Sequence, residues 1–162
     1  MGGRHVIRLF VTDVDGVLTD GSLDYGVSGP DRRIFNARDA HGVRMLVRMG
    51  VTVAFVTARR SHALNAFADD VGVEHVMAGN EPARMLADLQ RELGVDPEST
   101  AVMGDDVTDL PMFGMASIAF APADAEREVL DAAVIVTGRT GGHGAFRDAA
   151  RHVLSMNAEA AE

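Results

Sequence analysis

The feature that most constrains the fold of this chain is an apolar run near its start that ends in two carboxylates. Residues 7–12 read Ile-Arg-Leu-Phe-Val-Thr, which is typical of a buried strand, and Asp13, Asp15 and Gly16 follow closely. An acidic loop after a buried strand is expected at the carboxyl edge of a parallel sheet, where open α/β folds keep their sites. The simpler alternative is that these aspartates only cap a turn.

The remainder of the 162-residue chain alternates strand and helix patterns. Strands are predicted at 6–12, 51–56, 75–77, 100–103, 117–120 and 134–136. Helices are predicted from Asp39 to Gly50, from a Ser61 cap to Val71, and near 80–94, 123–131 and 145–156. This order predicts one α/β domain over residues 1–157, a Rossmann-like parallel sheet with helices on both faces, followed by a frayed tail at 158–162.

One segment interrupts this alternation directly after the acidic loop. The β-prone runs Leu23–Tyr25 and Arg33–Asn36 flank a turn-rich stretch at 26–31, so we expect a small β-hairpin flap that projects over the site. Neither this segment nor the stretch between Thr57 and Arg84 has room for a separate inserted domain.

Composition and charge exclude several classes of protein. The net charge of -9 argues against a nucleic-acid surface, so attraction for an anionic substrate has to be local. The chain has no apolar run long enough for a membrane span and no secretion signal, and it contains 0 Cys, which together fit a cytoplasmic protein. All 15 basic residues are Arg, so no role that requires Lys can be filled.

Polar clusters end two further predicted strands. Thr57 follows the strand at 51–56, and Asp105, Asp106 and Asp109 follow the strand at 100–103. Because the carboxyl ends of parallel strands share one edge, these side chains are expected to meet Asp13 and Asp15. Clustered carboxylates favour Mg²⁺, and a carboxylate can also attack phosphorus directly. A set of loop and helix-capping residues is the structural alternative.

The run Asp-x-Asp-Gly-x-Leu-Thr-Asp-Gly at 13–21 resembles the nucleophile motif of the haloacid dehalogenase superfamily of phosphohydrolases. That resemblance implies that Asp13 is the nucleophile and Asp15 the general acid and base. Thr57 matches the second motif, whose hydroxyl binds a phosphoryl oxygen. The family therefore implies a Mg²⁺-dependent phosphomonoester hydrolase that acts through an aspartyl-phosphate.

The Gly-Asp-Asp-x-x-Asp run at 104–109 matches the fourth motif, which supplies metal ligands. The resemblance implies coordination of Mg²⁺ by Asp105 together with the Asp13 carboxylate and the Asp15 carbonyl oxygen. Asp109 is expected to orient a water or a positive group near the metal. Asp106 could either bind a water at the metal site or cap the helix that follows.

The third motif departs from the family pattern. Related phosphatases commonly carry a Lys near the start of the helix before the fourth motif, and this chain has none. Arg84 is the nearest cation and can neutralise phosphate charge, although its planar fork differs from a Lys ammonium. The alternative is a surface Arg that pairs with Asp88 one turn further along the helix.

Along its whole length the chain resembles the capless, tetrameric branch of the superfamily typified by 3-deoxy-D-manno-octulosonate 8-phosphate phosphatase. Relatives in that branch act on nonulosonate 9-phosphates or occur as a domain of cytidylyltransferases. The matching segments are 13–21, 35–39 with Gly42, 57–61, 104–106 and 141–147, whereas Ala40 stands where the branch usually has Gly. The resemblance implies a homotetramer in which a neighbouring copy helps to close each site.

A sugar-acid substrate carries a carboxylate that a fork-shaped Arg recognises well. Arg59, next to the second motif, is the first candidate, and Arg38, His41 and Arg147 are further candidates for the carboxylate or hydroxyl groups. Each of them taken singly is also explained as an ordinary surface charge.

Three rival functions have to be weighed against a phosphatase. A response-regulator receiver shares the acidic pocket, the Mg²⁺ and the strand-end Thr, but it needs a late Lys and usually has adjacent acidic residues. A catalytically idle assembly domain would explain the missing Lys, but not the retention of Asp13, Asp15, Thr57 and Asp105 together. A phosphotransferase or mutase usually needs a cap that excludes water.

Overall fold

The protein is described by a computed structural model that covers residues 5–27 and 32–162, with a central sheet of six parallel strands. The strands are β1 (Leu9–Asp13), β2 (Thr52–Thr57), β3 (His75–Ala78), β4 (Thr100–Met103), β5 (Ile118–Ala121) and β6 (Ile135–Val136). They lie in the order β3-β2-β1-β4-β5-β6. The order reverses direction between β1 and β4, which is where open parallel sheets bind ligands. The expected Rossmann-like sheet is confirmed.

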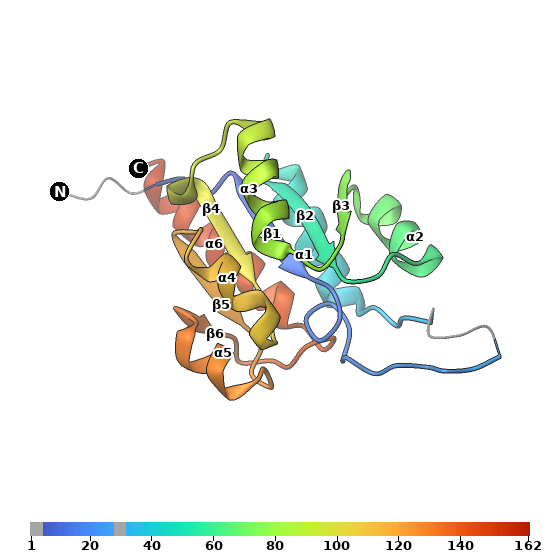
Figure 1. The fold of residues 1–162 in the computed structure, drawn as a ribbon. Coiled ribbons are helices and arrows are strands. Elements are labelled where there is room, and N and C mark those ends of the chain that lie inside the picture. The colour runs from blue at the N-terminus through green and yellow to red at the C-terminus, as the bar shows by residue number, and fades with distance from the viewer. Residues whose placement is uncertain (1–4, 28–31) are drawn as a thin grey trace.

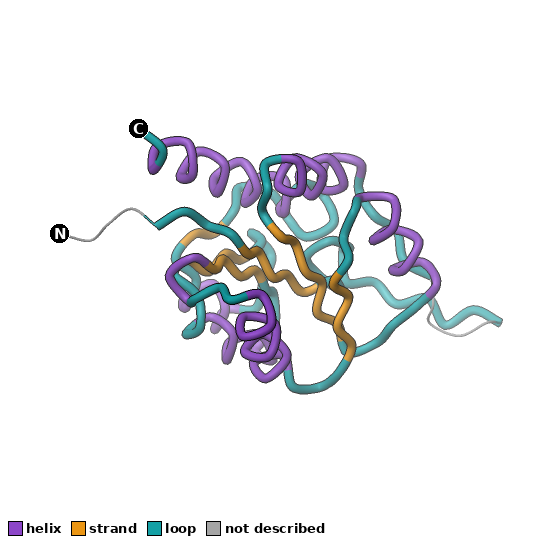
Figure 2. Tube along the Cα trace, turned by 90° about the horizontal axis from the view of Figure 1, so that it is seen from above, coloured by secondary structure: helices purple, strands orange, loops and turns teal. Residues whose placement is uncertain are grey.

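Helices cover both faces of the sheet (Figure 1, Figure 2). They are α1 (Ala37–Arg48), α2 (His62–Val71), α3 (Pro82–Leu93), α4 (Leu110–Phe113), α5 (Arg127–Ala132) and α6 (Ala145–Ala160), with short 3-10 helices η1 (Pro97–Ser99) and η2 (Val107–Asp109). Within the described residues, none of these helices combines the length and the hydropathy that a membrane crossing requires.

The side chains of β1 alternate between the two layers and fix the strand at the centre of the core. Phe10 packs with the cluster under α1, α2 and α6, where its ring centroid lies 4.9 Å from that of Phe146. Leu9 and Val11 point into the opposite cluster under α3 and α4. Because both faces of β1 are buried, its register is fixed, and Asp13 is held at the carboxyl edge.

The final helix is tied to the start of the sheet. The Asn157 side chain accepts a hydrogen bond from the Ile7 N–H at 2.8 Å and donates one to the Ile7 carbonyl oxygen at 2.9 Å. With this anchor, α6 continues to Ala160, so helix extends into the segment at 158–162 that the sequence pattern assigns to a frayed tail.

The start of α1 differs from the expected start at Asp39. The helix begins at Ala37, and the Asn36 side chain caps it by accepting the Arg38 N–H. Asp39 is buried and instead accepts the N–H groups of Gly144 and Arg147, both at 3.1 Å. Asp39 therefore holds the first turn of α6 against α1.

The expected hairpin flap is not formed in the described residues. Residues 22–27 and 32–36, which we call the arm, contain no strand, and most of the turn expected at 26–31 falls on residues 28–31, outside the described part. The arm extends away from the sheet (Figure 1). Phe35, at its end, stacks on Phe67 of α2 with ring centroids 4.0 Å apart, but Tyr25 is 72% and Ile34 71% exposed. An isolated two-stranded hairpin is marginal without packing of its side chains.

Candidate active site

Three carboxylates meet at the switch point of the sheet. One oxygen from each of Asp13, Asp105 and Asp109 lies within 4.8 Å of the others. Asp13 ends β1, and Asp105 and Asp109 come from the loop and η2 that follow β4, the strand that pairs with β1. The predicted convergence of the first and fourth motifs is therefore present in the structure.

The electrostatics of this cluster suit a divalent cation. Burial raises the pKa of Asp13 well above its usual value, and the charges of Asp109 and Asp105 raise it further. Burial and the Asp109 charge raise the pKa of Asp105 to about 7, and burial raises the pKa of Asp109. Three anionic groups held together in this way need protons or a cation. Oxygen donors in this number and spacing fit Mg²⁺, a hard ion.

Asp109 also supports the loop that carries the cluster. Its Oδ2 accepts the N–H groups of Asp105 at 2.9 Å and Asp106 at 3.2 Å. Gly104 makes this possible, because a Cβ there would lie 2.3 Å from the Asp109 Cβ. Asp106 is exposed, and its side chain accepts the Val107 N–H, so of its two expected roles the structure displays the helix cap.

A glycine contact brings the two acidic loops together. Gly16 has a φ of +87°, and a Cβ there would lie 1.9 Å from Asp105 Oδ2. The 138–144 loop packs on the other side, where the Gly142 N–H donates to the Val17 carbonyl oxygen at 2.9 Å. The acidic loop is thus in contact with the Asp105 carboxylate and with the backbone of the 138–144 loop.

Asp15 is not among the three clustered carboxylates, and its side chain is held by Arg33. Nε of Arg33 donates to Asp15 Oδ1 at 2.9 Å, and its NH2 nitrogen donates to Oδ2 at 3.0 Å. The same guanidinium donates to the Arg59 carbonyl oxygen at 3.1 Å and to the Ser61 hydroxyl, and the Arg33 side chain is only 4% exposed. Sequence reasoning missed Arg33, because it lies in the arm, where neither a periodic pattern nor a motif singles it out.

Thr57 lies between Asp15 and the cavity at the strand ends. Its Oγ1 lies 3.5 Å from Asp15 Oδ2 and accepts the Arg59 N–H at 3.2 Å. A cavity of about 160 Å³ opens beside it. The cavity is lined by Asp13, Val56, Thr57, Ala58, Gly79, Asn80, Pro82, Thr108 and Asp109. This small space, beside Asp13, Thr57 and Asp109, matches a phosphoryl group better than a whole sugar. We call it the phosphoryl cavity.

The structure does not bring Arg84 to this cavity. The Arg84 side chain is 73% exposed, and its guanidinium lies 3.4 Å from the Glu81 carboxylate. The partner is therefore Glu81 on the preceding turn and not Asp88, which pairs with Arg91. Pro82, at the first turn of α3, lines the cavity instead. The residues that line the cavity include no basic side chain.

The candidate substrate residues lie in two places. Arg59 contacts the site through its backbone, because its N–H donates to the Thr57 hydroxyl and its carbonyl oxygen accepts from Arg33. Arg38, His41 and Arg147 instead line a separate cavity of about 480 Å³ between α1 and α6. This cavity also contains Arg139 and Arg151, which sequence reasoning did not single out.

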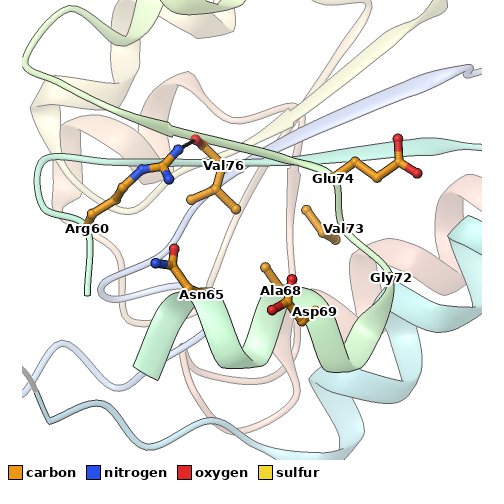
Figure 3. Close-up of a pocket in the computed structure, with 8 residues that line it drawn as sticks. All are labelled: Arg60, Asn65, Ala68, Asp69, Gly72, Val73, Glu74 and Val76. Atoms are coloured by element: carbon orange, nitrogen blue, oxygen red, sulfur yellow. Dashed lines mark hydrogen bonds between the residues drawn. The ribbon is translucent and has the colours of Figure 1, made fainter. Parts of the chain in front are cut away.

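Another cavity of about 500 Å³ lies between α2 and β3, away from the expected chemistry (Figure 3). The Arg60 guanidinium reaches across it to the Val76 carbonyl oxygen, while Asp69 and Glu74 lie further along its wall. Its lining includes none of the expected catalytic or metal-binding residues.

Comparison with known proteins places this geometry among known enzymes. A family profile described as haloacid dehalogenase-like hydrolase matches residues 82–147. The 3-deoxy-D-manno-octulosonate 8-phosphate phosphatase KdsC of Haemophilus influenzae is 39% identical over 149 residues, which cover 91% of this chain and 83% of that protein. The protein of the same name from Escherichia coli K12 is 34% identical over 143 residues, with coverage of 88% and 76%.

Solved structures agree with the sequence comparison. The cobalt-bound deoxy-D-mannose-octulosonate 8-phosphate phosphatase of Haemophilus influenzae superposes with a TM-score of 0.92 at 36% identity, covering 98% of this chain and 94% of that one. The Moraxella catarrhalis 3-deoxy-D-manno-octulosonate 8-phosphate phosphatase, in complex with magnesium, phosphate and KDO, has a TM-score of 0.91 at 28% identity. It covers 98% of this chain, which in turn covers 92% of that protein. Similarity therefore extends over nearly the whole chain.

Proposed function

The chain belongs to the haloacid dehalogenase-like hydrolases and is a phosphatase, and we propose that it hydrolyses 3-deoxy-D-manno-octulosonate 8-phosphate with the help of Mg²⁺. The observation that carries the proposal is the meeting of Asp13, Asp105 and Asp109 beside a cavity of phosphoryl size. The names of the relatives support the substrate, and the magnesium and phosphate in the Moraxella catarrhalis structure support the metal.

Asp13 and Asp105, with Asp109 beside them, are the residues that would hold the metal. When bound, Mg²⁺ offsets the repulsion between a carboxylate nucleophile and the substrate phosphate. The raised pKa values of Asp13 and Asp105 are a second reason to expect it, because burial first and the neighbouring carboxylates after it disfavour the charged forms, which a bound cation would stabilise.

The proposed chemistry uses two carboxylates of β1 and its loop. An Asp13 oxygen attacks phosphorus in line, the bond from phosphorus to the ester oxygen breaks, and Asp15 gives its proton to the leaving alcohol. Asp15 then takes a proton from the water that attacks the aspartyl-phosphate, which returns Asp13 and releases inorganic phosphate. The Thr57 hydroxyl and the N–H groups of the acidic loop stabilise the equatorial oxygens.

The missing third-motif cation leaves phosphate charge to be neutralised by other groups. The first turn of α3 reaches the cavity through Pro82, and the positive end of a helix favours anions. Arg84 would have to leave Glu81 to contribute. The idle scaffold that the missing Lys suggests is disfavoured by the convergence of Asp13, Asp105 and Asp109.

We propose that copies of the chain assemble as a homotetramer through the arm. Leu23, Tyr25, Val27 and Ile34 expose apolar surface there, and a partner copy would bury it. A neighbouring arm would also cover the phosphoryl cavity, which has no cap domain of its own. Light scattering of the wild-type protein and of the Tyr25→Asp variant tests this proposal, and a wild-type monomer would refute it.

The direct test of function is phosphate release from a panel of phosphomonoesters. We expect the highest kcat/KM with 3-deoxy-D-manno-octulosonate 8-phosphate, a lower one with a nonulosonate 9-phosphate, a much lower one with an aryl phosphate, and no turnover in EDTA. Preference for the nine-carbon acid would reassign the substrate within the same class. Equal rates on all three would refute the sugar-acid assignment, and metal-independent release would refute the mechanism.

A further inference from the structure

A separate and strongly basic cavity lies between α1 and α6. We call it the arginine cavity, and it is lined by Ala37, Arg38, His41, Arg139, Arg147 and Arg151, with a volume of about 480 Å³. No carboxylate is among these lining residues. The whole chain carries a net charge of -9 and 15 basic residues, so gathering four arginines in one cavity runs against its average charge.

The packing of two helices explains why these side chains converge. At Gly42 the helices approach so closely that a Cβ would lie 3.0 Å from the Arg147 Cα. Arg38 and His41 lie one turn apart on α1, and Arg147 and Arg151 one turn apart on α6. The basic side chains therefore stand on facing flanks of a rigid helix pair.

The charges in this cavity are poorly neutralised. Among the side chains of residues 5–27 and 32–162, Arg38, Arg147 and Arg151 form no ion pair with a carboxylate. Arg139 has only a partly exposed contact with Asp148 at 3.5 Å. Asp39 is committed to the N–H groups that begin α6. Like charges held this close repel each other, so an anion placed among them is attracted by all four.

We propose that the arginine cavity binds a small polyanion, one that carries at least two negative charges on phosphate or carboxylate groups. Its lining shares no residue with the phosphoryl cavity beside Asp13, so it is a site additional to the one where phosphate is released. It also gives Arg38, His41 and Arg147 a role apart from the reacting phosphate. Forked guanidinium groups suit such ligands because each can donate two parallel hydrogen bonds.

Calorimetric titration of the full chain with pyrophosphate in EDTA tests the proposal. EDTA removes any metal that would attract phosphate to the phosphoryl cavity, whose lining has no basic side chain, so the titration reports the arginine cavity. We expect saturable binding of one pyrophosphate per chain. Arg38→Gln and Arg151→Gln should each weaken it at least about tenfold, because each removes a charged donor. Citrate in place of pyrophosphate then distinguishes carboxylate from phosphate ligands.

Two controls make the result decisive. Arg91→Gln removes an exposed helical Arg that pairs with Asp88, and Asp13→Asn alters the phosphoryl cavity; both should leave pyrophosphate affinity within about twofold. Equal weakening in Arg91→Gln would mean general attraction and would overturn the proposal. A change of affinity in Asp13→Asn alone, above all tighter binding once that repelling carboxylate is gone, would place the anion in the other cavity and refute the proposal. Absence of saturable binding would also refute it. No turnover is measured, so failure here leaves the proposed phosphatase function unaffected. Unchanged thermal unfolding of Arg151→Gln, whose side chain is exposed, verifies its fold.

Discussion

Arg33, a residue of the arm, donates hydrogen bonds to both carboxylate oxygens of Asp15, at 2.9 Å and 3.0 Å. A general acid has to present a proton on one of those oxygens to the leaving group. One contact of the fork therefore has to open during the reaction, which couples the position of the arm to proton transfer in the proposed mechanism.

Replacing Arg33 should therefore reduce turnover by misplacing Asp15. We expect Arg33→Met and Arg33→Lys to lower kcat by about 10- to 100-fold, with the Lys variant less affected because it keeps the charge but loses the fork. KM should change less, since Arg33 lies outside the phosphoryl cavity. The matched control is Arg32→Met, because that side chain is 71% exposed and pairs with Asp24 in the arm. Equal losses in both variants would indicate a general effect on the arm and exclude a positioning role.

Asp13→Asn should abolish turnover without unfolding the protein. The amide cannot form the aspartyl-phosphate, so we expect kcat to fall by at least about 1,000-fold in a phosphate-release assay. Removing one buried charge from the cluster should also raise the melting temperature of the metal-free protein at neutral pH. Near-normal activity would disprove the assignment of the nucleophile.

Gly16→Ala should damage the site, whereas Gly50→Ala should damage stability alone. Both glycines have a left-handed backbone, with φ of +87° and +82°, so each substitution should cost about 1–2 kcal/mol of unfolding free energy. Only the new methyl at residue 16 meets Asp105 Oδ2, since nothing lies within 4 Å of the corresponding atom at Gly50. We expect the Mg²⁺ concentration needed for half-maximal activity to rise in the first variant and to stay unchanged in the second.

Stability of the metal-free protein should fall as pH rises from about 4 to about 7. In this window the unfolded chain has lost the protons of Asp13, Asp105 and Asp109, whereas the folded chain retains them because their pKa values are raised. Because the folded chain binds more protons than the unfolded chain in this window, each rise in pH favours the unfolded chain and lowers the unfolding free energy. Thermal unfolding in EDTA should show a drop of several degrees, which added Mg²⁺ reverses and Asp105→Asn diminishes. A flat profile in EDTA would contradict the raised pKa values.

Arg84→Ala tests whether Arg84 of α3 takes over the role of the missing third-motif Lys in neutralising phosphate charge. Because Arg84 faces solvent beside Glu81, we expect kcat/KM to change by less than about threefold. A loss greater than tenfold, with Arg91→Ala unaffected, would show that Arg84 moves to the phosphate during catalysis and would support the role expected from the sequence.

The sequence predicts the structure well where the spacing of apolar residues marks a helix or strand, and where polar residues mark the end of a strand. The apolar run before Asp13 and the polar residues after Met103 predict the sheet edge because burial on both faces leaves charged residues only at strand ends. The hairpin prediction was wrong for the described residues, since β-propensity needs a face to pack on. Arg33 and the arginine cavity depend on contacts between distant segments, such as Gly42 with Arg147, which local pattern does not encode.

The central place of β1 also has a consequence for biosynthesis. This strand leaves the ribosome first among the six, yet its hydrogen-bonding partners are β2 and, much later, β4. Until Met103 has emerged, one edge of the strand that bears Asp13 stays open and Asp105 cannot reach it. Bringing β4 to β1 closes a long loop of chain, and this step should limit the folding rate. Before it, the nascent N-terminal half should expose an unpaired apolar strand edge that chaperones recognise.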